Sequence, residues 1–284
     1  MAIFSNQATL TYNGNSTNSN IAYGEILDVL TATKTAVEGS YQPGETVTYV
    51  VTLRNTGTAA LTDLTVTDDL GGYPFNGATV YPLTYETGSV AMFVNGTPQA
   101  APAVAPGPPL VFSGINVPAG GDLVLVYQAL VNGYADPSAT GSIVNTVTVT
   151  GDGLSTPITA TETVTADAAP TLTISKSICP SQLVDNDRVT YTFVIQNSGN
   201  QPVIATDNAA ISDTFDPILT ALTVTFEGTA WTQGVQYNYN AATGLFTTVP
   251  GQILVPAATY TQDPTTGAYT VPPGVATLTV TGTI

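Results

Sequence analysis

The chain has 284 residues, which is enough for two domains of ordinary size. Charged residues make up only 8%, while glycine and proline number 26 and 20, and this composition favours a folded, turn-rich protein over a disordered acidic tail. The formal net charge of −16 opposes binding to nucleic acids and to anionic membranes. The chain has no histidine and one cysteine. This composition excludes a structural zinc site, a histidine-dependent nucleophile and an internal disulfide network. We therefore expect that the protein is not an enzyme.

The chain also lacks the signals of membrane insertion and secretion. No run approaches the 18 apolar residues of a membrane helix, and residues 1–14 carry neither a basic region nor an unbroken apolar core. The sequence therefore predicts no membrane insertion and shows no signal peptide.

Alternation of apolar and polar residues with a period of two recurs along the whole chain and predicts strands, whereas no segment has a helical pattern. The alternating runs are residues 27–35, 45–54, 61–70, 123–131, 143–151, 187–197 and 276–284. Turn signals such as Pro43-Gly44 and Pro272-Pro273-Gly274 separate them at the spacing of a β-sandwich. We predict an all-β protein built of immunoglobulin-like sandwiches.

An internal repeat divides the chain. The matching segments are 30–34 with 172–176, 47–57 with 189–199, 66–70 with 211–215, and 116–126 with 270–280. Their offsets of 142, 142, 145 and 154 residues indicate insertions that accumulate in the second copy. The repeat predicts a first domain over residues 25–168 and a second domain over residues 169–284.

The two copies differ in their last strand. The first copy continues to a strand at 143–151, but the second stops at Ile284 without an equivalent. A segment of the same pattern lies at the other end of the chain, at 4–12. We therefore predict a donor strand at residues 1–14, a flexible linker at 15–24, and a second domain that a neighbouring subunit completes.

Six polar residues lie in phase with apolar neighbours on their predicted strands, so all six are expected to face a core. Both lysines of the chain are among them, and they occupy the same repeat position. The six residues are Lys34, Lys176, Asp68, Asp213, Asn145 and Asn6. A buried amine, carboxyl and carboxamide are costly unless they meet one another.

Together these groups can form a Lys–Asn isopeptide bond without a cofactor or metal. Burial disfavours the charged amine, which becomes a nucleophile, while a catalytic aspartate polarises the amide and shuttles protons as ammonia leaves. We expect Asp68 and Asp213 to be these catalytic residues. The expected bonds are Lys34 to Asn145 within a subunit and Lys176 to Asn6 of the next one.

The order Lys, VTY, N-x-G, (V/I)-(T/S)-D and N-x-(V/A)-T resembles the bacterial surface repeat known as domain of unknown function eleven, in two copies over nearly the whole chain. The placement of Lys, Asp and Asn also resembles the self-crosslinking immunoglobulin-like domains of Gram-positive pilins and adhesins, in which the acid is often Glu. The two-repeat build without a signal peptide is similar to ribbon-like appendage proteins of clostridial spores. These resemblances imply an extracellular filament on a cell or spore, with assembly in the mother cell.

The expected partner is the chain itself, because an open head-to-tail contact generates a filament. Neighbouring filaments or a spore-surface anchor are further partners of such a fibre. In the first rival interpretation the N-terminal strand folds back into its own second domain, since residues 13–24 could span about 40 Å. In the second the protein is an adhesin or ligand-binding stalk, supported by the insertion at 100–109 and the tyrosines at 237–239.

Other interpretations of single residues remain open at this stage. The lysines could reach solvent from a domain edge, and the asparagines could begin strands without reacting. Asp68-Asp69 and Asp185-Asn186-Asp187 could bind calcium, although neither forms a recognisable loop. We expect Cys179 to be buried, with a disulfide between filaments as the alternative, and Trp231 to pack in or on the domain rather than bind a glycan.

Overall fold

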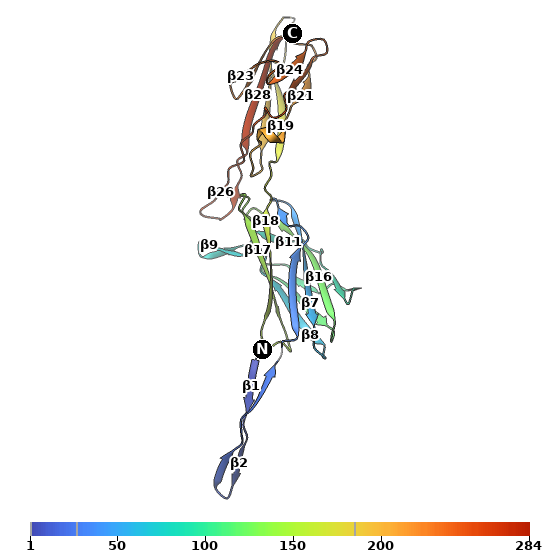
Figure 1. Ribbon diagram of the computed structural model, residues 1–284, viewed down its shortest axis with the longest axis vertical. Coiled ribbons are helices and arrows are strands. Elements are labelled where there is room, and N and C mark those ends of the chain that lie inside the picture. The colour runs from blue at the N-terminus through green and yellow to red at the C-terminus, as the bar shows by residue number, and fades with distance from the viewer. Residues whose placement is uncertain (1, 27, 185) are drawn as a thin grey trace. The chain divides into compact units, whose positions relative to one another are not determined.

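The computed structural model describes residues 2–26, 28–184 and 186–284 (Figure 1). The chain is all-β, and among the described residues the helical structure is a single 3-10 turn, η1 (Ala205–Asp207). Tertiary contacts divide it into two units, with residues 1–136 and 141–165 in the first and residues 137–140 and 166–284 in the second. Each unit is described separately below.

The first unit is an immunoglobulin-like sandwich of two antiparallel sheets. One sheet has the order β13 (Thr97–Gln99), β12 (Ala91–Val94), β16 (Asp122–Val131), β7 (Thr46–Asn55) and β5 (Leu30–Ala36), with β11 (Leu83–Tyr85) also paired to β16. The other has the order β14 (Ala103–Ala105), β15 (Leu110–Val117), β8 (Leu61–Asp68), β17 (Ser142–Thr150), β18 (Ile158–Ala166) and β6 (Ser40–Tyr41). A separate hairpin pairs β9 (Tyr73–Phe75) with β10 (Ala78–Val80).

The core of the first unit follows from the alternation of its strands. Along β7, Val47, Tyr49, Val51 and Leu53 are buried while the intervening residues are more exposed. Aromatic rings join the two sheets, since Tyr127 on β16 lies 5.1 Å from Phe112 on β15 between ring centroids. Each such aliphatic or aromatic side chain gains about 1.5–3 kcal/mol from burial, which holds the two sheets face to face.

The second unit has one complete sheet and one short sheet. The five-stranded sheet has the order β19 (Leu172–Cys179), β20 (Arg188–Asn197), β28 (Gly274–Thr283), β22 (Thr220–Phe226) and β23 (Thr229–Trp231). The short sheet has the order β21 (Ser212–Thr214), β25 (Leu245–Thr248) and β24 (Tyr237–Asn240), and β26 (Thr261–Gln262) pairs separately with β27 (Tyr269–Thr270).

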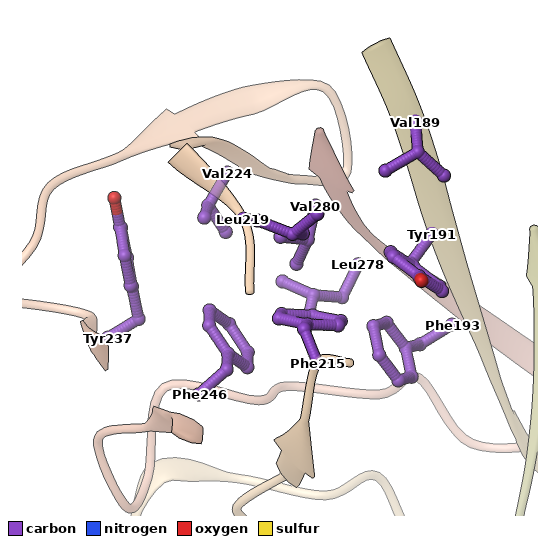
Figure 2. Packing of buried hydrophobic residues seen from close by; sticks show 10 residues of the cluster. All are labelled: Val189, Tyr191, Phe193, Phe215, Leu219, Val224, Tyr237, Phe246, Leu278 and Val280. Carbon is purple, nitrogen blue, oxygen red and sulfur yellow. The ribbon is translucent and has the colours of Figure 1, made fainter. Parts of the chain in front are cut away.

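An aromatic cluster forms the main core of the second unit. Figure 2 shows Phe215 between Phe246 and the side chains of Tyr191 and Phe193 on β20. The ring of Phe215 stacks on Tyr191 at 4.8 Å and lies 5.9 Å from Phe246. The cluster therefore joins the five-stranded sheet to the short sheet.

The N-terminal segment departs from the predicted single strand and flexible linker. Residues 15–24, expected to be the linker, instead lie largely in β3 (Asn15–Asn18) and β4 (Ala22–Ile26), which pair with β2 (Thr9–Tyr12) and β1 (Ala2–Asn6) respectively. Asn13 and Gly14 join β2 to β3 with φ of 46° and 83°. An Asn-Gly pair with both φ values positive makes the two-residue hairpin turn, a local signal that outweighs the polarity of the segment. Residues 2–26 thus form a hairpin, called the N-terminal hairpin below.

Candidate functional site

The first candidate site lies between the two sheets of the first unit. Lys34 on β5 and Asp68, the last residue of β8, meet there with Nζ 2.6 Å from Oδ2, and both side chains are completely buried. The sequence analysis predicted that these two residues meet. Two more donors reach the Asp68 carboxylate, the hydroxyl of Tyr127 and the backbone N–H of Leu70 at 2.7 Å. The carboxylate is therefore held in one orientation facing the amine.

Burial controls the proton on Lys34. Desolvation lowers the pKa of the Lys34 amine, and the negative charge of Asp68 opposes this effect. The amine also lies 4.6 Å from the centre of the Tyr49 ring. Burial raises the pKa of both Tyr49 and Tyr127, so these phenols stay neutral hydrogen-bond donors. The site is thus an ion pair enclosed by aromatic rings, in which deprotonation of the amine is easier than in water.

Asn145 completes this site. Its strand β17 pairs with β8, where Val147 lies opposite Asp68, and β17 also contacts β5 across the sandwich. Asn145 is completely buried, and neither its amide nitrogen nor its amide oxygen has a hydrogen-bond partner among the described residues. Its side chain lies beside the buried Tyr49 hydroxyl and, against the larger effect of burial, lowers the pKa of that phenol, but the two groups do not reach the geometry of an ordinary hydrogen bond. An unpaired buried carboxamide costs about 1–3 kcal/mol, so this residue requires an explanation beyond packing.

Three residues of this site were not predicted from the sequence. Tyr49 could have been found, because it belongs to the VTY segment that both repeats share. Tyr127 and Glu162 carried no such signal. Glu162 lies directly opposite Asn145 in the β17–β18 ladder, and after Asp68 and Asp69 its charge also raises the pKa of Lys34.

The second candidate site repeats the first but is open. Lys176 on β19 forms an ion pair with Asp213 on β21, and its amine lies 4.6 Å from the centre of the Tyr191 ring, as Lys34 does from Tyr49. Here, however, 39% of the Lys176 side chain and 20% of the Asp213 side chain are exposed. The expectation that Lys176 points into a closed core is wrong, because no described strand pairs with the free edge of β21.

One block of the repeat alignment is also wrong by one residue. In the ladders Tyr127 lies opposite Tyr49, whereas Val280 lies opposite Tyr191, so the structural offset is 153 rather than 154. A shift by one residue exchanges the two faces of a strand. Val280 therefore replaces Tyr127, and the second site lacks the phenol that bonds to the aspartate in the first.

Asn6, the predicted partner of Lys176, is the last residue of β1 and is exposed. The inward direction expected for it is not seen within the N-terminal hairpin, where Phe4, Leu10 and Tyr12 are 56%, 62% and 56% exposed. An apolar face of this size on an isolated hairpin is unusual, because such a hairpin is at best marginally stable in water. The meeting of Asn6 with Lys176 stays a prediction.

The remaining candidate residues make packing contacts or loop hydrogen bonds, except for Cys179. Trp231 stacks on Phe226 at 5.1 Å, and Tyr237 is buried against Phe246. Asn55 is buried and locks its loop, since its side chain accepts from the Gly57 N–H and donates to the carbonyl of Ala59. The repeat residue Asn197 does the same for its own loop. The expectation that Cys179 is buried is wrong, because β19 is uncovered and the thiol is exposed.

The calcium interpretation gains no support from these contacts. The Asp68 carboxylate is occupied by Lys34 and Tyr127, and Asp185 lies outside the described residues. Over residues 2–26, 28–184 and 186–284 there is no cluster of three or more acidic, cysteine or histidine side chains able to hold a metal ion. The same part of the chain holds no helix of the length and apolarity needed to cross a membrane.

Comparison with known proteins gives only distant structural matches. No family model matches the chain, and no curated protein does. The chain is similar to the major pilin subunit BcpA of Bacillus cereus, with 11% identity and a TM-score of 0.38 over 94% of this chain and 70% of that one. It is also similar to the pilus backbone RrgB of Streptococcus pneumoniae, with 13% identity and a TM-score of 0.36 over 86% and 55%. A collagen-binding domain of a Staphylococcus aureus adhesin matches with 10% identity and a TM-score of 0.32 over 49% and 99%. These values are too low to transfer a function, which has to be argued from this chain's own residues.

Proposed function

We propose that this protein is the structural subunit of a cell-surface or spore-surface filament, in which copies join head to tail and Lys–Asn isopeptide bonds lock them. The observation that carries the proposal is the contrast between two equivalent Lys–Asp pairs. The Lys34–Asp68 pair is completely buried near β17, the strand that carries the unpaired Asn145. The Lys176–Asp213 pair is partly exposed to solvent. In this proposal the open site of one copy receives Asn6 of the next.

The reaction at the first site needs no cofactor. The Lys34 ammonium passes a proton to Asp68, and the neutral amine attacks Cγ of Asn145. Asp68 then delivers this proton to the amide nitrogen and takes up the second proton of the amine as the C–N bond to the leaving group breaks, so ammonia leaves and Asp68 ends protonated. The products are one new amide bond and one molecule of ammonia, so each bond lowers the mass by about 17 Da.

The enclosed geometry supports this chemistry in two ways. Burial of Lys34 disfavours the ammonium form that cannot attack. Ladders to β7 and β8 hold β5 and β17 in place, and these two strands contact each other. A fixed placement of amine and carboxamide is worth effective concentrations of about 10⁵ M or more. We propose that this self-crosslinking is the chain's chemistry and that it turns over no substrate.

Mass spectrometry and boiling in SDS test the proposal. Boiled filaments of the native chain are expected to give a ladder of oligomers. Lys176→Ala should reduce the ladder to monomer that is still about 17 Da lighter than its sequence, because the Lys34–Asn145 bond remains. Asn145→Ala is the matched control, which should keep the ladder and lose the internal bond. Monomer of full sequence mass from native filaments would contradict the covalent part of the proposal.

A second candidate function is a ligand-binding stalk. An apolar cavity of about 230 Å³ lies in the first unit, and Ala101, Val104 and Pro106 of the 100–109 insertion line it together with Tyr85. Pockets for drug-sized ligands have volumes of about 300–1,000 Å³, so this cavity suits a smaller group such as part of a sugar or a side chain. A chain lacking residues 2–26 should still bind glycans or matrix proteins on an array if this function is correct, and should bind none if the protein is only a filament subunit.

A further inference from the structure

The two units differ at one sheet edge. In the first unit the aspartate strand β8 pairs with β15 on one side and with β17 on the other, and β17 is followed by β18 as a hairpin. In the second unit the aspartate strand β21 pairs with β25, and within the described ranges nothing pairs with its other edge. Beside β21 the described part of the second unit therefore lacks counterparts not only of β17 but also of β18 and β6.

Uncovered apolar side chains surround this edge. Every residue of β19 is exposed, whereas the equivalent strand β5 has Leu30 and Lys34 buried. A groove with a volume of about 160 Å³ runs between β19 and the segment leading into β21. Its apolar lining is Leu172, Ile174, Ile195, Ala209, Ile211 and Ile253. Exposed surface of this kind marks a contact that is made with another element.

The N-terminal hairpin carries a matching face. Phe4, Leu10 and Tyr12 alternate with Ser5, Thr9 and Thr11 along its first strand. Asn6 lies opposite Ala22 and Thr9 lies opposite Asn18. Between these two pairs the first strand advances by three residues and the return strand by four. The extra residue therefore lies on the return strand. Gln7 and Ala8 lie between β1 and β2, and we carry the period of two through them. Asn6 shares its face with Phe4 and Leu10.

The first unit separates the two attachment points. Asp28, just after the hairpin, accepts a hydrogen bond from the Ser155 hydroxyl in the β17–β18 loop, at the beginning of β18. The chain leaves the first unit at the other end of β18. β18 runs from Ile158 to Ala166, so its two ends are about 26 Å apart at 3.3 Å per residue. A donor at one end and the exit to the acceptor at the other favour addition to a second copy.

We propose that the whole N-terminal hairpin of a second copy, not a single strand, adds to the free edge of β21. The inference deepens the proposed filament and depends on it. The first strand of the hairpin takes the place of β17, and β3 and β4 take the place of β18. Adding an extended segment to an open edge satisfies backbone groups while alternate side chains fill the groove.

The ladder between β8 and β17 in the first unit predicts the register in which the hairpin adds to β21. If Asn6 occupies the place of Asn145, then Ala8 takes the place of Val147, which lies opposite Asp68. Ala8 then lies opposite Asp213, Thr9 opposite Ser212, and Leu10 opposite Ile211. The apolar residues of the hairpin enter the groove, and Asn6 covers the Lys176–Asp213 pair.

Paired cysteines test the register. The background is Cys179→Ser with Asn6→Ala, so that no native thiol and no Lys176–Asn6 bond interferes. Residues directly opposite in an antiparallel ladder have Cα atoms about 4.5–5.5 Å apart, within the range of a disulfide. Thr9→Cys with Ser212→Cys should give a ladder in non-reducing SDS that collapses on reduction. Thr9→Cys with Thr214→Cys, displaced by two residues, should give at least tenfold less.

A second pair of variants tests the face. Leu10→Asp should abolish assembly, because it places a charge in the apolar groove, whereas Thr11→Asp on the opposite face should assemble normally. Efficient crosslinking of the displaced pair, or a disulfide within a single chain, would overturn the inference while filaments in electron micrographs would still support the proposed function. Absence of any polymer from the native chain would instead refute the proposed function.

Discussion

At the residue scale, the first site owes its chemistry to complete burial. The same ion pair and the same 4.6 Å approach to a tyrosine ring occur in both units. The Lys34 side chain is completely buried, and desolvation lowers the pKa of its amine, whereas 39% of the Lys176 side chain is exposed. Covering the second pair with another strand would give it the environment of the first.

The lowered pKa of Lys34 predicts a pH dependence of stability when the bond cannot form. In Asn145→Ala, the unfolded chain binds a proton at Lys34 up to about its ordinary pKa of 10.5, while the folded chain releases it at lower pH. The unfolded state therefore holds more protons between these two pKa values, and the free energy of unfolding should rise with pH there by up to about 1.4 kcal/mol per unit. Urea denaturation between pH 7 and 10 measures this slope.

Lys34→Met combined with Asp68→Asn and Asn145→Ala is the control for that slope, because a buried Asp68 carboxylate without its cation would itself titrate. It keeps a long apolar side chain but has no amine to titrate, so its slope should be smaller by the contribution of one proton. Equal slopes in the two variants would show that the buried amine has an ordinary pKa.

At the element scale, the N-terminal hairpin depends on its turn more than a core hairpin does. It is exposed on both strands, so its stability comes from ladder hydrogen bonds and from the turn geometry at Asn13 and Gly14. Another Asn-Gly turn, Asn76 and Gly77, joins β9 to β10 with nearly the same φ values of 48° and 78°. The chain thus contains a matched comparison for the effect of this turn.

Gly14→Ala should slow filament assembly by roughly tenfold. A Cβ at Gly14 meets no atom within 4 Å, so the penalty comes from the positive φ alone, and a left-handed alanine costs about 1–2 kcal/mol. Light scattering during assembly measures the rate. Gly77→Ala also meets no atom and carries the same backbone penalty, but should leave the rate unchanged because β9 and β10 take no part in the contact.

At the scale of the whole molecule, the proposed polymerisation follows from having a donor and an acceptor that differ. A head-to-tail contact of two different surfaces does not close on itself unless the geometry makes a ring. In the proposed arrangement each copy contributes one hairpin and one open edge, so a copy with only one of them ends the filament. Each copy has a net charge of −16, so the copies repel one another. The contact between hairpin and edge has to be strong enough to overcome this repulsion.

A chain lacking residues 2–26 is therefore expected to act as a terminator. It offers the open β21 edge but has no hairpin to pass on, so adding it at a tenth of the native concentration should shorten filaments to about ten subunits when every addition goes to completion. Electron micrographs give the length distribution. The same truncation with Leu172→Asp and Ile174→Asp, which charges the groove, is the control and should leave the length unchanged.

The sequence alone determined most of the strands, the two repeats and the burial of Lys34, Asp68 and Asn145. Alternation fixed which side of each strand is buried, because period two leaves each side chain one of two faces. That rule found Lys34, Asp68 and Asn145 although they lie far apart in the chain. It found the same residue types in the second repeat for the same reason.

Tertiary structure decided which side chains are covered, which alternation does not determine. Phase tells which face a side chain takes but not whether another strand covers that face, so Lys176 and Cys179 were assigned to a core and are exposed. Glu162 and Tyr127 joined the first site only through ladder register, which depends on pairing between distant strands. The sequence therefore determined the direction of each side chain, whereas only the folded chain decided which groups are enclosed, because enclosure depends on elements brought together from elsewhere.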